Sequence, residues 1–306
     1  MSRTLTRFAY VVAACSVFSC RPEPPAPAPG ARVKTCVSIP PQAYFVERVG
    51  GEHVEVMVLV GPGQSPHTFE PTPRQAAELA ACQVYFRIGM PFEKQLVQKI
   101  AASFQDLRIV DNKEGIPLRR MTAAESVEKE DADHVEHDED LDPHVWMSPR
   151  LAKTLAATIR DTLVGVDPAH QADYAGNYQT LAADLDACDA RIARVLEPLK
   201  GREIFVFHPA FGYFADAYGL RQVAVAPGGR EPSAKHLGEL IDQARKQGVR
   251  VIFVQPQFAR KNAEVVAEAI GGAVVPMDDL SRDYLPNLLD MAAKVEKALT
   301  GAADGR

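Results

Sequence analysis

Short apolar runs alternate with amphipathic segments along most of the chain. A first series begins at residue 33 and consists of VKTCVSI, VEVMVLV, VYFRIG and LRIV. A second series begins after residue 200 and consists of EIFVFH, RQVAVA, VRVIFVQ and AVVPM. Segments with helical periodicity, such as FEKQLVQKIAASF and RKNAEVVAEAIGG, separate these runs. Repetition of strand, helix and strand predicts parallel sheets covered by helices, so the pattern indicates two α/β lobes.

The strongest periodic signal lies between the two series. Apolar side chains recur at spacings of 4, 3, 4, 3, 4, 3 and 4 from Tyr174 to Leu199, which is the pattern of one amphipathic helix. Asp167 and Pro168 provide its start signal. At ~1.5 Å per residue such a helix is about 40 Å long and would pass behind both lobes as a stiff strut. A coiled-coil dimer is the alternative use of this stripe, but a monomer is expected.

The first twenty residues have the features of an export signal. Two arginines precede an apolar stretch, residues 8–18, that is too short to span a bilayer. VFSC resembles a lipoprotein cleavage box, after which Cys20 would be the lipidated N-terminus, and VAAC at residues 12–15 is the alternative. The proline-rich segment that follows suits an extended stalk. We expect an exported protein in the periplasm or at the cell surface, held at a membrane only by the lipid, or simply cleaved.

The predicted organisation is a signal peptide (1–19), a proline-rich linker (20–32), a first lobe (33–167), a linking helix (168–199) and a second lobe (200–306).

The negative charge of the chain is concentrated in one segment. Residues 128–142 hold nine acidic residues and one lysine, a net charge of −8, so the rest of the chain carries +2 of the overall −6. Such a run is expected to be a solvated, disordered tether. His134 and His137 lie within it, and imidazoles beside carboxylates are borderline ligands for zinc and its neighbours. We therefore expect weak metal capture by this acidic histidine loop, residues 125–142. The chain has no basic patch, so nucleic acid is not an expected partner.

The cysteines do not form a ligand set. Outside the signal they are Cys36, Cys82 and Cys188, which have no CxxC spacing. In an exported protein Cys36 and Cys82 could pair, and the sequence leaves this open.

Three of the eight histidines are expected in loops that follow strands. In α/β sheets, ligands collect at the carboxyl ends of the strands. His67 follows VEVMVLV within GPGQSPHTFEPTP, His144 lies in DPHVWMSP just before a helix, and His208 ends the strand EIFVF. Asp278 has the equivalent position after AVVPM, with Asp279 beside it. His53, His170 and His236, by contrast, are expected to have ordinary surface or packing roles.

The motifs SPHTFEPTP, DPHVWMSP, FHPAFGYF and PMDDL resemble, in this order, those of the zinc- and manganese-specific substrate-binding proteins of bacterial ABC importers, the cluster A-I metal-binding lipoproteins. The similarity runs from about residue 33 to residue 299. Each motif alone is weak, whereas the ordered set with an acidic histidine loop before DPH is specific. The resemblance implies two Rossmann-like lobes, each a four-stranded parallel sheet flanked by helices, joined by one long rigid helix. One departure is Gln255, in VIFVQPQF, where the family commonly has glutamate.

The resemblance also implies a ligand set in the cleft between the lobes. His67 and His144 would come from the first lobe, and His208 and Asp278 from the second. Asp279 replaces a frequent proline, so either aspartate could be the fourth ligand. Three imidazoles and one carboxylate favour Zn²⁺ as the transported ligand, with Mn²⁺ or Fe²⁺ as the alternative.

The function expected from these features is high-affinity capture of zinc outside the cytoplasmic membrane and delivery to the membrane subunits of an ABC permease. A zinc-dependent hydrolase needs an open coordination position and a general base. The chain has no HExxH, GxSxG or P-loop lysine, and a closed four-ligand site offers no position to a substrate, so an enzyme is not expected. A surface adhesin remains open as a second activity. Because the ligands must be neutral imidazoles, affinity is expected to fall as the pH drops through ~6.5.

Overall fold

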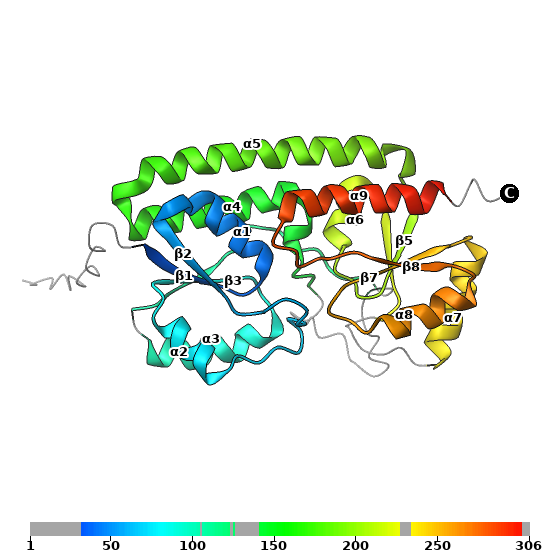
Figure 1. Ribbon diagram of the computed structural model, residues 1–306, viewed down its shortest axis with the longest axis horizontal. Helices are drawn as coiled ribbons and strands as arrows, with labels where there is room; N and C mark the ends of the chain where they lie inside the picture. The colour runs from blue at the N-terminus through cyan, green and yellow to red at the C-terminus, as the bar shows by residue number, and fades with distance from the viewer. Residues whose placement is uncertain (1–31, 105, 123–124, 126–140, 227–233, 302–306) are drawn as a thin grey trace, which may run out of the picture.

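Two α/β lobes lie side by side in the computed structural model, and one long helix runs across both of them (Figure 1). The structure describes residues 32–104, 106–122, 125, 141–226 and 234–301. The signal peptide, Cys20, His134 and His137 therefore lie outside the described residues. The fold class expected from the sequence is confirmed, with a four-stranded parallel sheet in each lobe.

The sheet of the first lobe has the strand order β2-β1-β3-β4, with all neighbours parallel. Its central strands are buried on both faces, as a parallel sheet between helices requires, and its edge strands are more exposed. Every helix of this lobe begins with proline, whose missing N–H has no partner to lose in the first turn. The strands are β1 (Val33–Val37), β2 (Val54–Val58), β3 (Val84–Arg87) and β4 (Arg108–Asp111), and the helices are α1 (Pro40–Gly50), α2 (Pro73–Ala80), α3 (Pro91–Ser103) and α4 (Pro149–Val166).

The second lobe repeats this topology with the order β6-β5-β7-β8. Helices α7 and α8 lie on the far side of its sheet from the long helix, and α6 and α9 lie on the near side (Figure 1). The strands are β5 (Glu203–Val206), β6 (Arg221–Ala224), β7 (Val251–Val254) and β8 (Ala273–Pro276), and the helices are α6 (Gly212–Tyr218), α7 (Ala234–Lys246), α8 (Arg260–Ala269) and α9 (Tyr284–Thr300).

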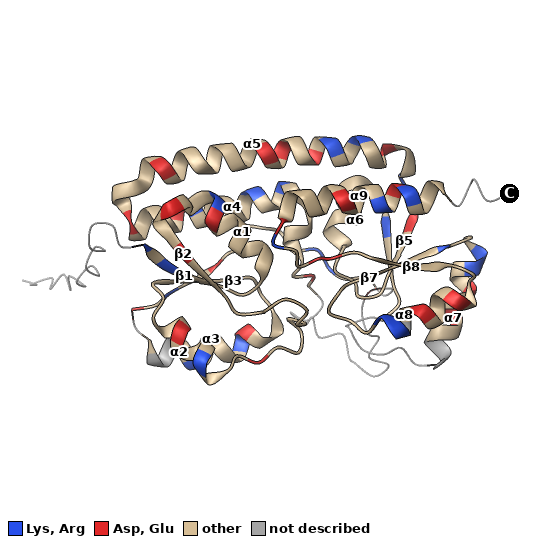
Figure 2. Cartoon of the chain, in the orientation of Figure 1, with Lys and Arg blue, Asp and Glu red and all other residues tan. Residues whose placement is uncertain are grey.

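The long helix is α5 (Gln171–Leu196), with single 3₁₀ turns at both ends, η4 (Pro168–His170) and η5 (Glu197–Leu199). It packs against α1 and α4 of the first lobe and α9 of the second. Most of the predicted apolar stripe is buried there, while charged residues of both signs are distributed along the helix (Figure 2). The stripe is thus covered within one chain.

Side chains also tie the lobes together directly. Trp146 Nε1 donates a hydrogen bond of 2.7 Å to the backbone oxygen of Asp279, and Tyr284 Oη donates to the backbone oxygen of Trp146. Arg282, just before α9, pairs with Glu47 of α1. Apolar residues of the first lobe, α5 and α9 form one continuous core. The lobes are therefore fastened at their junction as well as through α5.

None of the helices in the described part of the chain combines the length and the hydropathy that a membrane crossing requires.

Candidate metal centre

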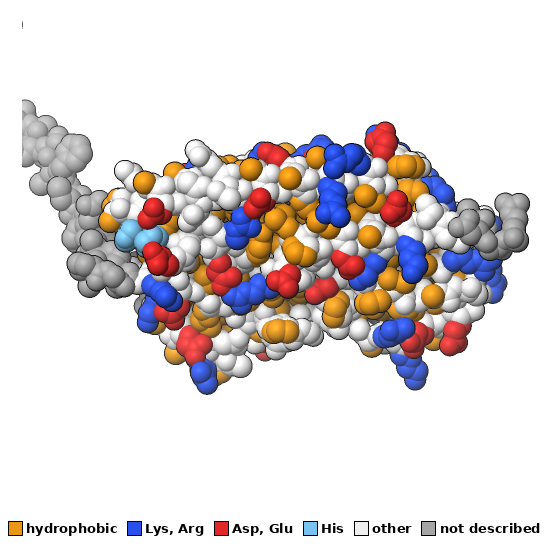
Figure 3. Space-filling model, turned by 45° about the horizontal axis from the view of Figure 1, so that its top comes forward, with side chains coloured by type: hydrophobic (Ala, Val, Ile, Leu, Met, Phe, Trp, Pro, Cys, Tyr) orange, Lys and Arg blue, Asp and Glu red, His pale blue; other side chains and the backbone are white. Residues whose placement is uncertain are grey.

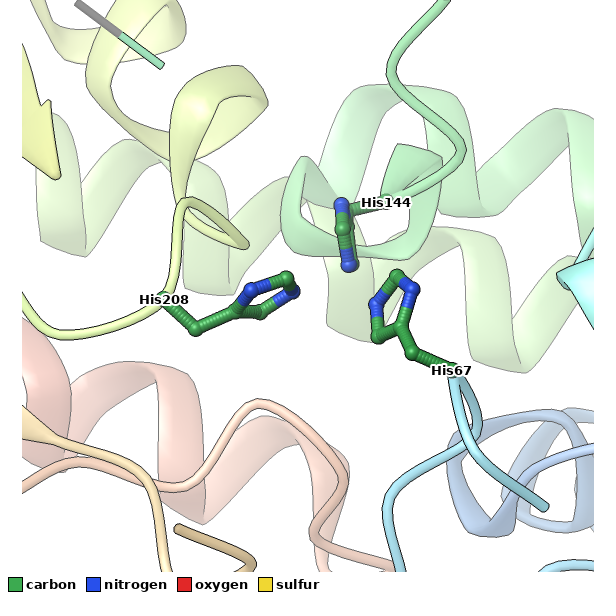
Figure 4. Close-up of side chains that lie close together, drawn as sticks. All are labelled: His67, His144 and His208. Atoms are coloured by element: carbon green, nitrogen blue, oxygen red, sulfur yellow. The ribbon is translucent and has the colours of Figure 1, made fainter. Parts of the chain in front are cut away.

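Three histidines from both lobes meet where the lobes face each other. His67 lies between β2 and α2, His144 directly precedes the 3₁₀ turn η3 (Val145–Met147) before α4, and His208 follows β5. One ring nitrogen from each lies within 4.8 Å of the others. The ring centroids are 4.6 Å apart for His67 and His208, 5.3 Å for His144 and His208, and 5.7 Å for His67 and His144. Figure 4 shows the three rings directed at a common space.

This spacing fits a metal ion after a small adjustment. Zn–N bonds of ~2.0–2.1 Å place tetrahedral ligand nitrogens about 3.4 Å apart. The rings approach from separate loops. Side-chain rotations that move each ring nitrogen by about an ångström would bring the three nitrogens to the distances that a bound zinc ion requires. Among the described residues, His67, His144 and His208 form the one group of three or more histidine, cysteine or carboxylate side chains whose donor atoms lie close enough together to hold a metal ion.

The ring of His144 is oriented by Asp142. The carboxylate accepts hydrogen bonds from the His144 backbone N–H at 2.9 Å and from ring Nδ1 at 2.7 Å. Burial would raise the pKa of Asp142, but its interactions with His144 and the hydrogen bond from Arg119 hold it below its ordinary value, so the group accepts as a carboxylate. Nδ1 therefore carries the proton, and Nε2 keeps its lone pair for a metal.

His208 is held through its backbone. Its N–H donates to Gln255 Oε1 at 3.2 Å, and Gln255 Nε2 donates to its carbonyl oxygen at 2.8 Å. A glutamate could not make the second bond, so the departure from the family pattern at Gln255 has a structural use. The His208 ring is buried, and neither of its nitrogens has a hydrogen-bond partner in the described structure. Such a group is costly unless something binds it.

Electrostatics keep two of the imidazoles neutral. Burial, reinforced by His144, lowers the pKa of His67 to about 3. Burial, with His67 and His144 nearby, lowers the pKa of His208 well below its ordinary value. Neutral imidazole is the form that coordinates a metal, so at neutral pH these two rings need not lose a proton first.

The two aspartates expected near the site differ in their surroundings. Asp278 is partly exposed, and its Oδ1 accepts a hydrogen bond from the backbone N–H of Leu280 at 2.8 Å. Asp279 is buried, and its Oδ1 accepts from Gln257 Nε2 at 2.7 Å. Burial raises the pKa of Asp279 to about 6, while the nearby His144 lowers it. Neither carboxylate has an oxygen within the cluster of histidine nitrogens. Of the two, Asp279 is the one that interacts electrostatically with a member of the cluster, His144.

The expectation of a solvated acidic tether is wrong for Asp142, which is buried. Glu125, the first residue of the acidic histidine loop, is buried as well. Both side chains pair with Arg119, whose role the sequence did not reveal. The sequence feature that could have identified Asp142 is its position two residues before His144, with a proline between them. At this spacing one carboxylate can reach both the backbone N–H and the ring of His144.

Two further histidines, His53 and His170, do not belong to the cluster of three. His53 and His170 stack with ring centroids 3.8 Å apart and pair with Asp173 and Asp167. Histidine side chains flanked by acidic ones are visible at one end of the surface in Figure 3. The side chain of His236 is outside the described residues. Cys36, Cys82 and Cys188 are free thiols.

The sequence family described as zinc-uptake complex component A, periplasmic (ZnuA) matches residues 36–299. The chain belongs to this family. The family resemblance expected from the motifs is thereby confirmed, and it is of the zinc type.

ZnuA relatives agree in fold and sequence. A crystal structure of a ZnuA deletion mutant with zinc bound matches with a TM-score of 0.79 at 36% identity, over 87% of this chain and 98% of that one. The high-affinity zinc uptake system protein ZnuA of Bacillus subtilis is 28% identical over 279 residues, which is 88% of this chain and 85% of the relative. The zinc-binding lipoprotein AdcA of Streptococcus pneumoniae is 27% identical over 274 residues, which covers 86% of this chain but only 54% of AdcA.

Proposed function

We propose that this ZnuA-family protein captures Zn²⁺ outside the cytoplasmic membrane and delivers it to the membrane subunits of an ABC permease. The observation that carries the proposal is the convergence of His67, His144 and His208 from both lobes, with both ring nitrogens of His208 buried and without a hydrogen-bond partner among the described residues. Three imidazoles are a typical zinc ligand set and a poorer one for manganese, which prefers oxygen. The zinc-bound ZnuA relative supports zinc as the cargo.

Asp279 is our candidate for the fourth ligand. Its carboxylate is buried and interacts with His144, whereas Asp278 is partly exposed and its Oδ1 is engaged with its own backbone. The Trp146 hydrogen bond to the Asp279 backbone brings this segment of the second lobe against the segment that carries His144. A carboxylate there would also reduce the charge of the bound Zn²⁺ in a buried site.

Capture then consists of exchanging the water shell of Zn²⁺ for protein donors. His67 and His208 are already neutral, and Asp142 keeps the His144 lone pair available, so little rearrangement is needed before binding. A closed set of four ligands leaves no coordination position for a water nucleophile, and for this reason we propose a carrier and not an enzyme.

Attachment and assembly follow from other features. Export with lipidation of Cys20 would place the protein on a proline-rich stalk at the membrane that holds the permease. A monomer is favoured because the apolar stripe of α5 is covered by α1, α4 and α9 of the same chain. His134 and His137 would bind additional metal weakly.

Elemental analysis of protein purified without chelators, followed by chelator competition with Zn²⁺ and Mn²⁺, tests the proposal. We expect one tightly bound zinc per chain, weaker manganese binding, and loss of the tight equivalent in His208→Ala. Tighter binding of manganese than zinc would refute the cargo assignment, and unchanged zinc binding by His208→Ala would refute the site.

A further inference from the structure

The guanidinium group of Arg119 binds three carboxylates at once. Nη1 lies 2.8 Å from Asp142 Oδ2, Nη2 lies 3.1 Å from Glu125 Oε2, and Nε lies 2.9 Å from Asp216 Oδ2. Asp142 and Glu125 are buried, and the Arg119 side chain is only 15% exposed. A planar guanidinium with a fixed fork of N–H donors is suited to hold several carboxylates in fixed directions.

One of these carboxylates also orients a proposed zinc ligand. Asp142 accepts from Arg119 at Oδ2 and from His144 Nδ1 at Oδ1. The two bonds use opposite oxygens, so Arg119 fixes the rotation of the carboxylate that fixes the His144 ring. We infer that Arg119 is a positioning residue for the zinc site, acting on His144 through Asp142. This inference rests on the proposed function.

Arg119 joins this arrangement to the second lobe. Its backbone N–H donates to Tyr213 Oη at 3.0 Å, and Tyr213 Oη donates to the backbone oxygen of Asp142 at 2.9 Å. The guanidinium carbon lies 5.9 Å from the centroid of the Tyr213 ring. Tyr213 and Asp216 both belong to α6, the helix that follows the His208 loop. The residue that fixes a first-lobe ligand is therefore bound to the helix beside the second-lobe ligand.

A second contact supports the same link. Gln222 of β6 donates to Glu125 Oε1 at 2.7 Å and accepts from the backbone N–H of Phe211 at 2.7 Å. Arg119 holds the other side of Glu125. The chain of contacts thus runs from β6 and the start of α6 through Glu125 and Arg119 to Asp142.

Gly212, the first residue of α6, leaves the room that this cluster occupies. A Cβ atom at this position would lie 2.8 Å from Asp142 Oδ2 and still closer to the Arg119 guanidinium, which no real contact permits. Alanine at this position must displace Arg119, Asp142 or α6. Gly212→Ala therefore perturbs the same cluster without removing any of its polar groups.

Arg119→Gln provides the main test, with three measurements on the purified full-length chain. They are the zinc Kd by chelator competition, the visible absorption spectrum of Co²⁺ bound in place of Zn²⁺, and the melting temperature of the metal-free protein. Glutamine cannot bind three carboxylates, so we expect a 10- to 100-fold weaker zinc affinity, the usual range for residues that orient a metal ligand, and an altered Co²⁺ spectrum. Arg119→Lys should restore part of the affinity, because one ammonium retains a bond to Asp142.

Arg74→Gln is the matched control. Arg74 is an exposed arginine of α2 that pairs with Glu78 one helical turn away. Its removal should leave affinity and spectrum unchanged. In an Asp142→Asn background, Arg119→Gln should weaken zinc binding little further, because Arg119 acts on His144 through Asp142. If the two substitutions weaken zinc binding additively, Arg119 does not act through Asp142.

A purely structural role has a distinct signature. If Arg119→Gln lowers only the melting temperature, and Kd and the Co²⁺ spectrum match those of wild type, the inference is wrong even though zinc binding stands. If wild type itself lacks tight zinc or His208→Ala leaves it unchanged, the proposed function fails first. Should Arg119→Gln not fold, Gly212→Ala and Arg119→Lys supply the test, and wild-type affinity and spectrum in both would overturn the inference.

Discussion

Nδ1 of His144 lies 2.7 Å from Oδ1 of Asp142, and both side chains are buried. A carboxylate behind an imidazole fixes the ring tautomer and increases the basicity of the opposite nitrogen. Asp142→Asn keeps an oxygen acceptor but removes the charge, so we expect about tenfold weaker zinc binding, and a larger loss in Asp142→Ala. Chelator competition at constant pH measures both. Equal affinity in Asp142→Ala and wild type would show that the bond is irrelevant to the metal.

The pH dependence of zinc binding should differ from that of three ordinary histidines. The pKa of His67 is lowered to about 3 and that of His208 lies well below its ordinary value, so protons do not displace zinc from these rings near pH 6.5. The pKa of Asp279 is raised to about 6, so its carboxylate gains a proton as the pH falls through this value. Affinity should therefore be nearly constant above pH 7 and fall below about 6.

Asp279→Asn separates this effect from the histidines. The variant should bind zinc more weakly than wild type at pH 7.5 and lose less affinity between pH 7 and pH 5, because its side chain no longer takes up a proton. Competition titrations across this range provide the measurement, with Asp278→Asn as the neighbouring control. A wild-type pH profile in Asp279→Asn would assign the titration to another group.

The stability of the metal-free protein should also depend on pH. In the unfolded chain His67 and His208 would bind protons near pH 6.5, whereas folding holds both neutral because it lowers their pKa values. Unfolding then takes up protons, so the free energy of unfolding decreases as the pH falls below about 6.5. Denaturant titrations at pH 7.5 and 5.5 should show this loss, and it should be smaller in His208→Ala. A loss of the same size in both proteins would contradict it.

Deletion within the acidic segment should spare the tight site. Removing residues 127–140 leaves Glu125 and Asp142, and with them the contacts to Arg119. We expect unchanged Kd for the first zinc and loss of additional weak equivalents contributed by His134 and His137. Isothermal titration resolves the two classes. Loss of the tight equivalent would mean that this segment itself supplies a ligand.

Zinc binding should cause only a small change in overall shape. Helix α5 spans both lobes, and Trp146, Tyr284 and the Glu47–Arg282 pair fasten the junction. Small-angle scattering should give nearly the same radius of gyration with and without zinc. A decrease typical of hinge closure in two-domain binding proteins would contradict this.

The sequence predicted the lobes and the three histidines because these signals are local. Each strand is a short apolar run, the stripe of α5 is a simple repeat, and each histidine lies in a proline-containing motif, His67 in the loop after β2, His144 just before α4 and His208 just after β5. Topology then brings the strand ends to one edge in each lobe, which needs no knowledge of side-chain packing.

The rest of the site depends on contacts between distant segments. The spacing of Asp142 to His144 indicates a local contact, but the burial of Asp142 depends on the approach of Arg119 and Tyr213 from other segments. The two aspartates after β8 are adjacent, so composition cannot rank them, and the difference comes from Trp146 and Gln257 against Asp279. Arg119 itself stands in no motif.

The division of the histidines between the lobes has a consequence for unloading. His67 and His144 belong to the first lobe, while His208 belongs to the second. If a permease draws the lobes apart, the cation loses the donors of one lobe together and keeps two, either His67 and His144 on the first lobe or His208 and the proposed ligand Asp279 on the second. Its other side is then open to water, so the protein would release the ion in two steps of two bonds each.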